Sequence, residues 1–510
     1  MKSDNIAVEL RGITKSFGAV KANDKVDLTV EKGEILSLLG ENGSGKTTLM
    51  NMLSGIYYPD EGQILIDGKE VVIKNPKDAF DLGIGMVHQH FKLVDVLSAA
   101  ENIVLGFKGK LNLKDSIRRI NEICEKYGFD VDPNQKIYDM SVSQKQTVEI
   151  VKVLYRGAKI LILDEPTAVL TPQETEKLFN VLRNMKKDGK SIVIITHKLN
   201  EVMEISDRVA ILRKGAYIGS LITKDTNAQE MTDMMVGHKV VLNIERPEPE
   251  NVKRRLEVKN LTVRDAEGVL KLKDVSFTAN SGEILGIAGI SGCGQKELLE
   301  SIAGLQVTES GSVIYYNKET DEPEELIGKD PLKIADMGVA LSFVPEDRLG
   351  MGLVGNMDLT SNMMLRSFRN GRSLFTDRKE PHKIAEHVVN FLEVSTPSLE
   401  TPVRKLSGGN VQKVLVGREI SNAPTVLMTA YAVRGLDINS SYAIYDPLNQ
   451  QKERGVAVIF VGEDLDVLLA LSDRVMVLCG GEVSGILDGR TADKNEVGMM
   501  MTMLGGSKGE

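Results

Sequence analysis

A duplication constrains the fold of this chain more than any other feature of its 510 residues. Lys32-Gly33-Glu34-Ile35-Leu36 recurs as Ser281-Gly282-Glu283-Ile284-Leu285, and Ser206-Asp207-Arg208-Val209 recurs as Ser472-Asp473-Arg474-Val475. Because internal similarity on this scale marks repeated structural units, the chain is expected to fold as two similar domains. We place the first copy at residues 1–243, a linker at 244–255 and the second copy at 256–506. Arg246-Pro247-Glu248-Pro249-Glu250-Asn251 predicts a short, stiff and solvated linker.

A glycine-rich loop in the first copy predicts a phosphate-binding site. The loop reads Gly40-Glu41-Asn42-Gly43-Ser44-Gly45-Lys46-Thr47-Thr48, between the apolar runs Ile35–Leu39 and Leu49–Leu53. This order of strand, G-x-x-x-x-G-K-[ST] loop and helix lets backbone N–H groups and the helix end bind a phosphate chain. Lys46 would reach the outer phosphates, and the Thr47 hydroxyl would hold Mg²⁺. A simple glycine turn is the alternative, and the Lys-Thr pair disfavours it.

Short apolar runs predict an α/β fold with a parallel sheet in each copy. Ile160–Leu163 and Ser191–Ile195 are rich in β-branched residues, as expected of strands that are buried on both faces. Each copy begins with β-rich segments, at 7–30 and 256–279, and continues with a mostly helical middle. We therefore expect two α/β lobes, each with a β-rich subdomain, a parallel-sheet core and a helical insert.

Polar residues that follow apolar strands are the candidates for catalysis. Asp164 and Glu165 follow Ile160–Leu163, where Asp164 would hold Mg²⁺ and Glu165 would orient and deprotonate the attacking water. His197 closes another apolar strand and could donate to the γ-phosphate, although a hydrogen-bonded structural histidine is the commoner case. Gln89 could touch both metal and water, or be a surface residue. Phe17 could stack on adenine, or belong to the core.

Composition excludes several classes of function. The net charge of −9 leaves no basic excess for nucleic acid. Cys124, Cys293 and Cys479 are too few and too scattered for a disulfide framework or a metal cluster, so a reducing compartment is expected. The N-terminus lacks the apolar segment of a signal peptide, and no apolar run approaches the about 20 residues of a membrane span. A cytoplasmic protein is expected.

The order of glycine loop, Gln89, a Leu-Ser-Gly-Gly-type signature, Asp164-Glu165-Pro166-Thr167 and His197 resembles the ATP-binding subunit of ATP-binding-cassette (ABC) transporters. Two cassettes in one chain resemble the importers of simple sugars and nucleosides. The segments 83–94 and 428–437 resemble the nucleoside branch, in which Gln89-His90 stands where sugar members tend to have Gln-Glu. The resemblance covers nearly the whole chain.

This resemblance implies an ATPase that uses ATP and Mg²⁺ and sits at the cytoplasmic face of a membrane. It makes Gln89, Asp164, Glu165 and His197 functional by position. The implied partners are two integral-membrane permease subunits, contacted by the helical inserts after Gln89 and Glu346, and an extracytoplasmic solute-binding (lipo)protein. Nucleic acid is not an expected partner.

Alignment of the copies predicts that they have lost complementary parts. In the second copy, Lys46 becomes Gln295, Thr47 becomes Lys296, and Asp164-Glu165 becomes Ala430-Tyr431, while His197 becomes Glu463 and Gln89 falls near Glu346. The signature is Leu406-Ser407-Gly408-Gly409-Asn410 in the second copy but Met140-Ser141-Val142-Ser143-Gln144 in the first. Asp437 in the second copy likewise corresponds to Thr171. The second glycine loop should not hydrolyse ATP, although it could still bind a nucleotide.

Cassettes of this family associate head to tail, so each ATP lies between one copy's glycine loop and the other copy's signature. The resemblance therefore implies one hydrolytic site, with Lys46, Asp164, Glu165 and His197 facing Ser407, Gly408 and Gly409, and one degenerate site. Two alternatives stay open. The solute could be a sugar such as ribose or galactose, or the chain could be a soluble tandem ATPase that acts on ribosomes or DNA, although the short acidic linker disfavours the second.

Overall fold

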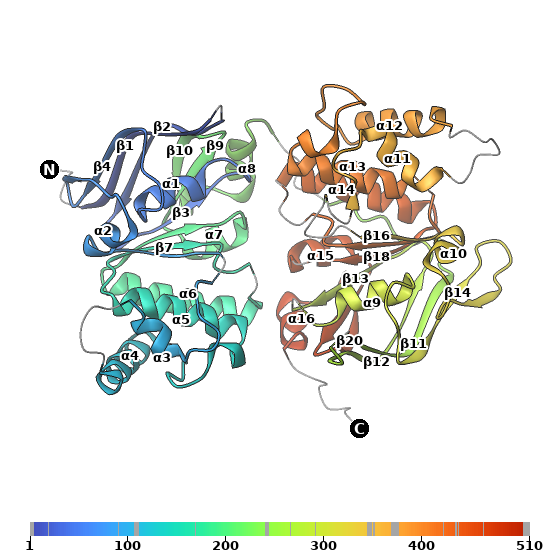
Figure 1. The fold of residues 1–510 in the computed structure, drawn as a ribbon, viewed down its shortest axis with the longest axis horizontal. Helices are drawn as coiled ribbons and strands as arrows, with labels where there is room; N and C mark the ends of the chain where they lie inside the picture. The colour runs from blue at the N-terminus through green and yellow to red at the C-terminus, as the bar shows by residue number, and fades with distance from the viewer. Residues whose placement is uncertain are drawn as a thin grey trace. The chain divides into compact units, whose positions relative to one another are not determined.

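Two compact units make up the chain, Met1–Val241 and Leu242–Glu510. The structure is a computed structural model that describes residues 5–18, 20–89, 91–106, 112–168, 170–239, 244–265, 267–290, 292–343, 349, 352–368, 377–421, 423–433, 436, 438–462 and 464–502. Each unit is an α/β body with two sheets (Figure 1). None of the helices within these ranges is long and apolar enough to cross a membrane.

The first unit contains a four-stranded antiparallel sheet and a six-stranded, mostly parallel one. The small sheet has the order β2 (Val20–Glu31), β1 (Ile6–Phe17), β4 (Glu61–Ile66) and β5 (Lys69–Val71). The large sheet has the order β10 (Ala216–Ile222), β9 (Arg208–Arg213), β3 (Ile35–Leu39), β8 (Ser191–Ile195), β7 (Ile160–Asp164) and β6 (Ile84–Val87), in which β10 is antiparallel to β9. Strands β3, β7 and β8 are buried at every position, as the apolar runs predict.

Helices of the first unit cover the large sheet and form the insert. α1 (Lys46–Leu53) lies between the two sheets (Figure 1), and its Leu49 and Met50 share one core with residues of both. The insert comprises α3 (Ala99–Val104), α4 (Leu113–Tyr127) and α5 (Val142–Tyr155), with its own core. The other helices are α2 (Pro76–Asp81), α6 (Pro172–Lys187), α7 (Leu199–Ile205) and α8 (Ala228–Val236).

The second unit repeats this plan. Its small sheet has the order β12 (Leu270–Asn280), β11 (Arg254–Arg264), β14 (Ser310–Tyr316) and β15 (Pro323–Glu325). Its large sheet has the order β16 (Val339–Phe343), β17 (Val426–Ala430), β18 (Ala457–Val461), β13 (Ile284–Gly289), β19 (Arg474–Cys479) and β20 (Glu482–Asp488). The helices are α9 (Gln295–Ile302), α10 (Pro331–Asp336), α11 (Leu359–Ser367), α12 (Lys379–Phe391), α13 (Gly408–Ile420), α14 (Ile438–Glu453), α15 (Leu465–Leu471) and α16 (Lys494–Met500). The matching strand orders confirm the duplication.

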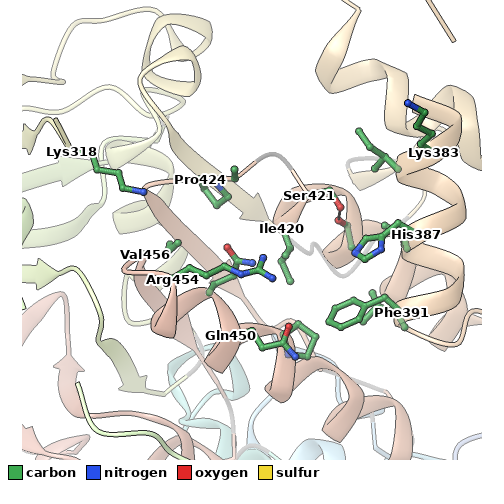
Figure 2. Close-up of a pocket in the computed structure, with 17 residues that line it drawn as sticks. Lys318, Lys383, His387, Phe391, Ile420, Ser421, Pro424, Gln450, Arg454 and Val456 are labelled. Atoms are coloured by element: carbon green, nitrogen blue, oxygen red, sulfur yellow. Dashed lines mark hydrogen bonds between the residues drawn. The ribbon is translucent and has the colours of Figure 1, made fainter. Parts of the chain in front are cut away.

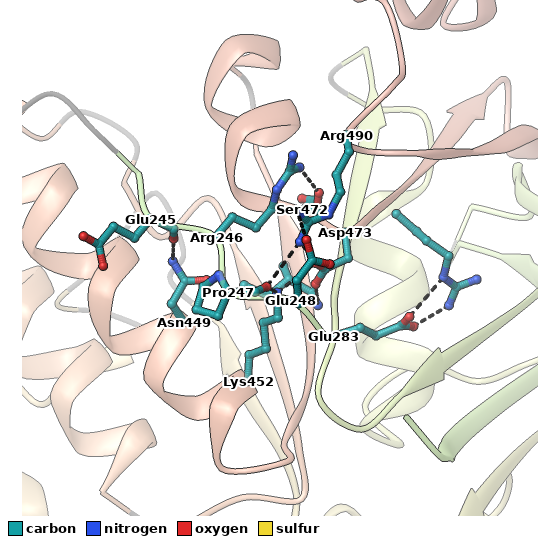
Figure 3. Close-up of polar contacts among 12 residues, drawn as sticks. Glu245, Arg246, Pro247, Glu248, Glu283, Asn449, Lys452, Ser472, Asp473 and Arg490 are labelled. Carbon is teal, nitrogen blue, oxygen red and sulfur yellow. Dashed lines mark hydrogen bonds and ion pairs between the residues drawn. The ribbon is translucent and has the colours of Figure 1, made fainter. Parts of the chain in front are cut away.

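The linker packs on the second unit instead of lying free in solvent. The Arg246 guanidinium donates to the carbonyls of Leu469 and Ser472, at 2.8 and 2.6 Å, and the carbonyl of Pro247 accepts from the Lys452 ammonium (Figure 3). The expectation of a solvated linker is therefore wrong for Arg246 and Pro247. The proline-rich composition keeps the segment extended, and extended backbone leaves its carbonyls available to donors on α14.

Beneath the linker lies a buried ion pair. Lys452 Nζ is 2.8 Å from Asp473 Oδ1, and the two side chains are only 1% and 5% exposed. Lys186 and Asp207 form the corresponding pair in the first unit, where the side chains are 37% and 39% exposed. In both units the second carboxylate oxygen accepts the N–H of the first residue of the strand that precedes the glycine loop, Ile35 or Ile284. The linker thus converts an accessible ion pair into a buried one.

Candidate functional site

The glycine loop of the first unit joins β3 to α1 and is shaped by positive φ angles. Gly43 and Gly45 have φ of 80° and 96°, and Gly45 caps α1 in the left-handed region. A Cβ at Gly45 would lie 2.2 Å from the Ala22 carbonyl oxygen, so no other residue fits there. Ser44 Oγ is buried and has no hydrogen-bond partner among the described residues. A buried hydroxyl without a partner inside such a loop fits an anionic group that accepts from it.

Lys46 lies back across the loop. Its ammonium donates to the carbonyl oxygens of Gly40 and Glu41, at 2.7 and 3.0 Å, and the residue is 6% exposed. Burial lowers the pKa of Lys46, while the carboxylates of Glu165 and Asp164 oppose this shift. The cation therefore stands at the start of α1, where the backbone N–H groups of the helix also favour an anion.

Thr47 and Asp164 form the second part of the site. Thr47 is the next residue of α1, and Asp164 ends β7 and is 8% exposed. Burial, and then the charge of Glu165, raise the pKa of Asp164 to about 6, whereas a hydrogen bond with Thr47 and the charge of Lys46 oppose the rise. A hydroxyl and a carboxylate side by side are the hard oxygen donors that Mg²⁺ takes, and a bound cation would also relieve the unfavourable burial of the Asp164 charge.

Glu165 is held between Gln89 and His197. Its two carboxylate oxygens accept from Gln89 Nε2 at 2.9 Å and from His197 Nδ1 at 3.1 Å. These residues come from the carboxyl ends of the neighbouring strands β6, β7 and β8. The hydrogen bond with His197 is the largest influence on Glu165 and lowers its pKa, against the effect of burial. Glu165 is therefore ionised at neutral pH and able to accept a proton.

The backbone of Glu165 is unusual. Its φ is 46°, a left-handed conformation that is strained for a residue with a side chain, and its N–H donates to the Ile195 carbonyl at 2.8 Å. The same strain recurs at Tyr431 in the second unit, where φ is 54° and the N–H donates to the Val461 carbonyl at 3.0 Å. Both units thus keep one backbone bend after the strand that ends in Asp164 or Ala430.

Phe17 lies at the end of β1 and is 45% exposed, so the alternative of a core residue is wrong. Its ring packs against Tyr57 in a T-shaped arrangement, with centroids 5.2 Å apart and an interplanar angle of 70°, and Lys15 Nζ lies 5.7 Å from its centroid. The exposed ring of Phe17 is thus supported by a second ring. Sequence reasoning missed Tyr57, because nothing in its neighbourhood in the sequence connects it to Phe17.

The second unit keeps the shape of the glycine loop without its chemistry. Gln295 takes the place of Lys46, is 3% exposed, and donates through Nε2 to the Ile290 carbonyl at 3.2 Å. Lys296 lies 3.7 Å from Glu300 on the same helix and so follows the helix surface rather than the loop. Ala430 carries no ligand for a metal. Several positions that the sequence predictions include lie outside the described residues; these are His90, Glu346, Arg434, Gly435, Asp437 and Glu463.

The two signatures begin equivalent helices in different ways. Ser141 caps α5 in a capping box, in which the side chains of Ser141 and Gln144 each accept the backbone N–H of the other residue. Ser407 caps α13, accepts from Asn410 Nδ2 at 2.9 Å, and is followed by Gly408 and Gly409. Ser407 and Gly408 are exposed, and so is the Val142 side chain at the position of Gly408. Only α13 therefore offers an N-terminus free of side chains that would obstruct an approaching phosphate.

Comparison with known proteins assigns the family. The model of the family described as "ABC transporter" matches residues 23–168 and 272–429. The chain is 41% identical to the nucleoside import ATP-binding protein NupA of Lactococcus lactis, over 100% of both chains. It is 40% identical to the guanosine import ATP-binding protein NupO of Bacillus subtilis, over 97% of each chain. It is 38% identical to the ribose import ATP-binding protein RbsA of Corynebacterium glutamicum, over 96% of this chain and 92% of that one. The chain belongs to the ABC transporter family, as an import ATP-binding protein with two cassettes in one polypeptide.

Proposed function

We propose that the chain powers the import of nucleosides with one hydrolytic site and one degenerate site. The observation that carries the proposal is the asymmetry between the cassettes. The first cassette holds Glu165 between Gln89 and His197, whereas the second has Tyr431 at the position of Glu165. The second cassette has the glycines of the signature, and the first does not.

In the hydrolytic site, the loop Gly40–Thr48 and Lys46 bind the phosphates of ATP, and Thr47 and Asp164 hold Mg²⁺. The ion neutralises charge on the phosphates when it is bound. Phe17 stacks on the adenine, with Tyr57 behind it. Ser407, Gly408 and Gly409 of the second cassette close over the γ-phosphate, because a helix start without side chains allows backbone N–H groups to approach the anion.

Glu165 accepts a proton from the attacking water at the carboxylate that Gln89 and His197 hold in place. The hydrogen bond from His197 keeps Glu165 ionised and fixes its orientation, so that no side-chain freedom is lost during the reaction. We assign His197 to this positioning, in addition to the contact with the γ-phosphate expected from the sequence. Since ATP is bound from both cassettes only when they are together, hydrolysis shifts the chain back toward separated cassettes.

The remaining parts of the proposal follow from the family. We place the chain at the cytoplasmic face of a membrane, bound to two permease subunits that receive solute from an extracytoplasmic binding protein. The guanosine and nucleoside importers among its relatives support a nucleoside as the solute, and the ribose relative keeps a sugar as the second candidate. A function on ribosomes or DNA has less support, since the net charge is −9 and the linker packs on the second cassette.

Matched substitutions in the two cassettes test the asymmetry. In the complex with its permease, Lys46→Ala or Glu165→Gln should abolish ATP hydrolysis and uptake, while Gln295→Ala should leave measurable hydrolysis. Gly408→Val gives the second signature the side chain that Val142 provides in the first, and should abolish hydrolysis, whereas Val142→Ala should have little effect. Comparable losses in both members of these pairs would refute the asymmetric site. Uptake of labelled guanosine against labelled ribose identifies the solute.

A further inference from the structure

A cavity of about 510 Å³ opens in the second cassette, away from the glycine loop and the signature. It lies between the helical insert, represented by α12 and α13, and the core helix α14 with the turn that follows it (Figure 2). Its volume falls within the range of about 300–1,000 Å³ that is typical of sites for small molecules. The proposed mechanism assigns no role to any of the residues that line it.

One wall of the cavity carries a stacked pair of rings. His387 and Phe391 stand one turn apart on α12, with ring centroids 5.5 Å apart and an interplanar angle of 7°. Both residues are exposed, Phe391 by 41%. Ile420 of α13 and Val388 add apolar surface beside them. The two rings and the aliphatic side chains beside them form an apolar wall, which suits a planar ring of a ligand.

The opposite wall is cationic. Arg454 follows α14, and its guanidinium points toward the middle of the cavity, while Lys318 reaches the rim from the turn after β14 (Figure 2). Neither cation forms an ion pair with a described residue, and none of the described residues that line the cavity is acidic. Gln451, which is 3% exposed, also lines the cavity. An arginine and a lysine that have no counter-ion among the described residues together fit a ligand that carries an anionic group.

In the first cassette, side chains bridge the helical insert and the core at the position that corresponds to the cavity. There the residue after the core helix α6 is Asp188, at the position of Arg454. Its carboxylate binds Lys126 Nζ at 2.7 Å and Tyr127 Oη at 2.6 Å, both at the end of α4. The second cassette has replaced this acid with an arginine and has Phe391 and Leu392 at the end of α12. The bridge between the insert and the core is therefore absent, and a cation faces the cavity instead.

The signature helix connects this cavity to ATP. α13 begins at the signature with Gly408 and ends at Ile420, which lines the cavity, so the two ends are about 20 Å apart at a rise of about 1.5 Å per residue. A Cβ at Gly417 would lie 2.5 Å from Val388 Cγ1, so α12 and α13 are in tight contact. A ligand held between α12 and Arg454 would thus restrain the whole signature helix relative to the core.

We propose that this cavity is a regulatory site for a planar-ring phosphate, and that its ligand is a nucleoside 5′-monophosphate. The ring would lie against His387 and Phe391, and the phosphate would bind Arg454 and Lys318. The choice of a nucleoside monophosphate rests on the proposed function, because phosphorylation of an imported nucleoside produces it. Occupation would lock the signature helix to the core and slow hydrolysis at the distant ATP.

Calorimetric titration of the full chain with GMP tests the site. The Glu165→Gln chain is used with excess ATP and Mg²⁺, so that nucleotide already occupies the glycine loop of the first cassette. Arg454→Asp, which introduces the acid of the first cassette, and Phe391→Ala should each weaken GMP binding about tenfold or more. Lys379→Asp changes the charge by the same amount as Arg454→Asp, but at the start of α12 and outside the cavity. It should leave GMP binding unchanged. Guanosine and inorganic phosphate should each bind more weakly than GMP.

Three results would overturn the inference: no GMP binding, binding that survives Arg454→Asp, or inorganic phosphate that binds as tightly as GMP. In the chain with Glu165 intact, GMP should lower ATP hydrolysis at least twofold, and Arg454→Asp should remove this effect without changing the basal rate. Failed GMP binding leaves the proposed function intact, because uptake is measured separately. If the chain does not support nucleoside uptake, the proposed function is refuted. GMP binding that depends on Arg454 would in that case still support the cavity as a binding site.

Discussion

Replacing Lys452 by methionine should destabilise the second cassette far more than Lys186→Met destabilises the first. The two lysines occupy the same place in the repeat, and both aspartates also accept a backbone N–H from the strand before the glycine loop. They differ in exposure, since the side chains of Lys452 and Asp473 are 1% and 5% exposed whereas those of Lys186 and Asp207 are 37% and 39% exposed. Methionine keeps most of the volume of the lysine stem and removes only the charge and its hydrogen bonds.

The magnitude follows from what each substitution leaves behind. Removing one partner of a buried ion pair typically costs about 3–5 kcal/mol, because the other charge stays buried. Arg490 Nη2 lies 3.7 Å from Asp473 Oδ1 and compensates in part, which favours the lower end. The Pro247 carbonyl loses one of its two donors but keeps Arg490 Nη2 at 3.4 Å, so this loss adds less than about 1 kcal/mol. For Lys452→Met we expect a loss of about 3–5 kcal/mol, against about 0–1 kcal/mol for the exposed pair in Lys186→Met.

Hydrogen exchange followed by mass spectrometry separates the cassettes within the full chain. Lys452→Met should reduce the protection of amides in β13 and β19 by about 100-fold or more, since about 1.4 kcal/mol corresponds to a factor of ten. Protection in β3 and β9 should not change. Equal losses for the two substitutions, or an unaffected β13, would refute the reasoning that the linker buries this ion pair.

Three further predictions concern the proposed hydrolytic site. Burial and Glu165 raise the pKa of Asp164 from 3.8 to about 6. The ionised carboxylate therefore lowers the free energy of unfolding progressively as the pH rises from about 4 to 6, and the full loss is reached above that range. Asp164→Asn should stabilise the nucleotide-free, metal-free chain at pH 8 by up to about 3 kcal/mol, and not at pH 4, which melting curves at both values check; equal stability at pH 8 would contradict this expectation. His197→Ala removes the hydrogen bond that lowers the pKa of Glu165, so the acid limb of the kcat profile should move to higher pH, and an unchanged limb would argue against Glu165 as the base. Phe17→Ala should weaken ATP binding to the Glu165→Gln chain by about 5- to 150-fold, as expected for loss of about 1–3 kcal/mol of base stacking, whereas Tyr57→Phe, which keeps the supporting ring, should not.

The sequence predicts the elements that position the site because local patterns determine them. The apolar runs 35–39 and 191–195 coincide with β3 and β8, and the glycines at 40, 43 and 45 predict the phosphate-binding loop. The sequence predicts Gln89, Glu165 and His197 one by one, and the parallel sheet brings them together because they follow neighbouring strands. Their hydrogen bonds were not predictable, since which group His197 contacts depends on side-chain positions rather than on strand order.

Contacts between distant segments account for what the sequence does not predict. Tyr57 supports Phe17 from the loop after α1, and the linker is held by donors more than 200 residues away, at Lys452 and Arg490. The cavity in the second cassette depends on a difference between Asp188 and Arg454 that becomes visible only when the end of α12 lies opposite. No repeat, motif or spacing in the sequence predicts these contacts between distant residues.

The left-handed backbone shared by Glu165 and Tyr431 bears on the history of the chain. In the proposed function this strained bend aims the carboxylate of Glu165, and the second cassette keeps the bend for Tyr431 although the strain is unfavourable. Gln146 and Gln412 bind the carbonyls just beyond this bend in the two cassettes, which shows that the supporting contacts have been kept as well. Divergence has therefore replaced side chains on a backbone frame that both cassettes share, as expected after duplication of a gene that encodes one cassette. If the second site is degenerate, as proposed, a return to activity would require new side chains at a few positions but no new fold.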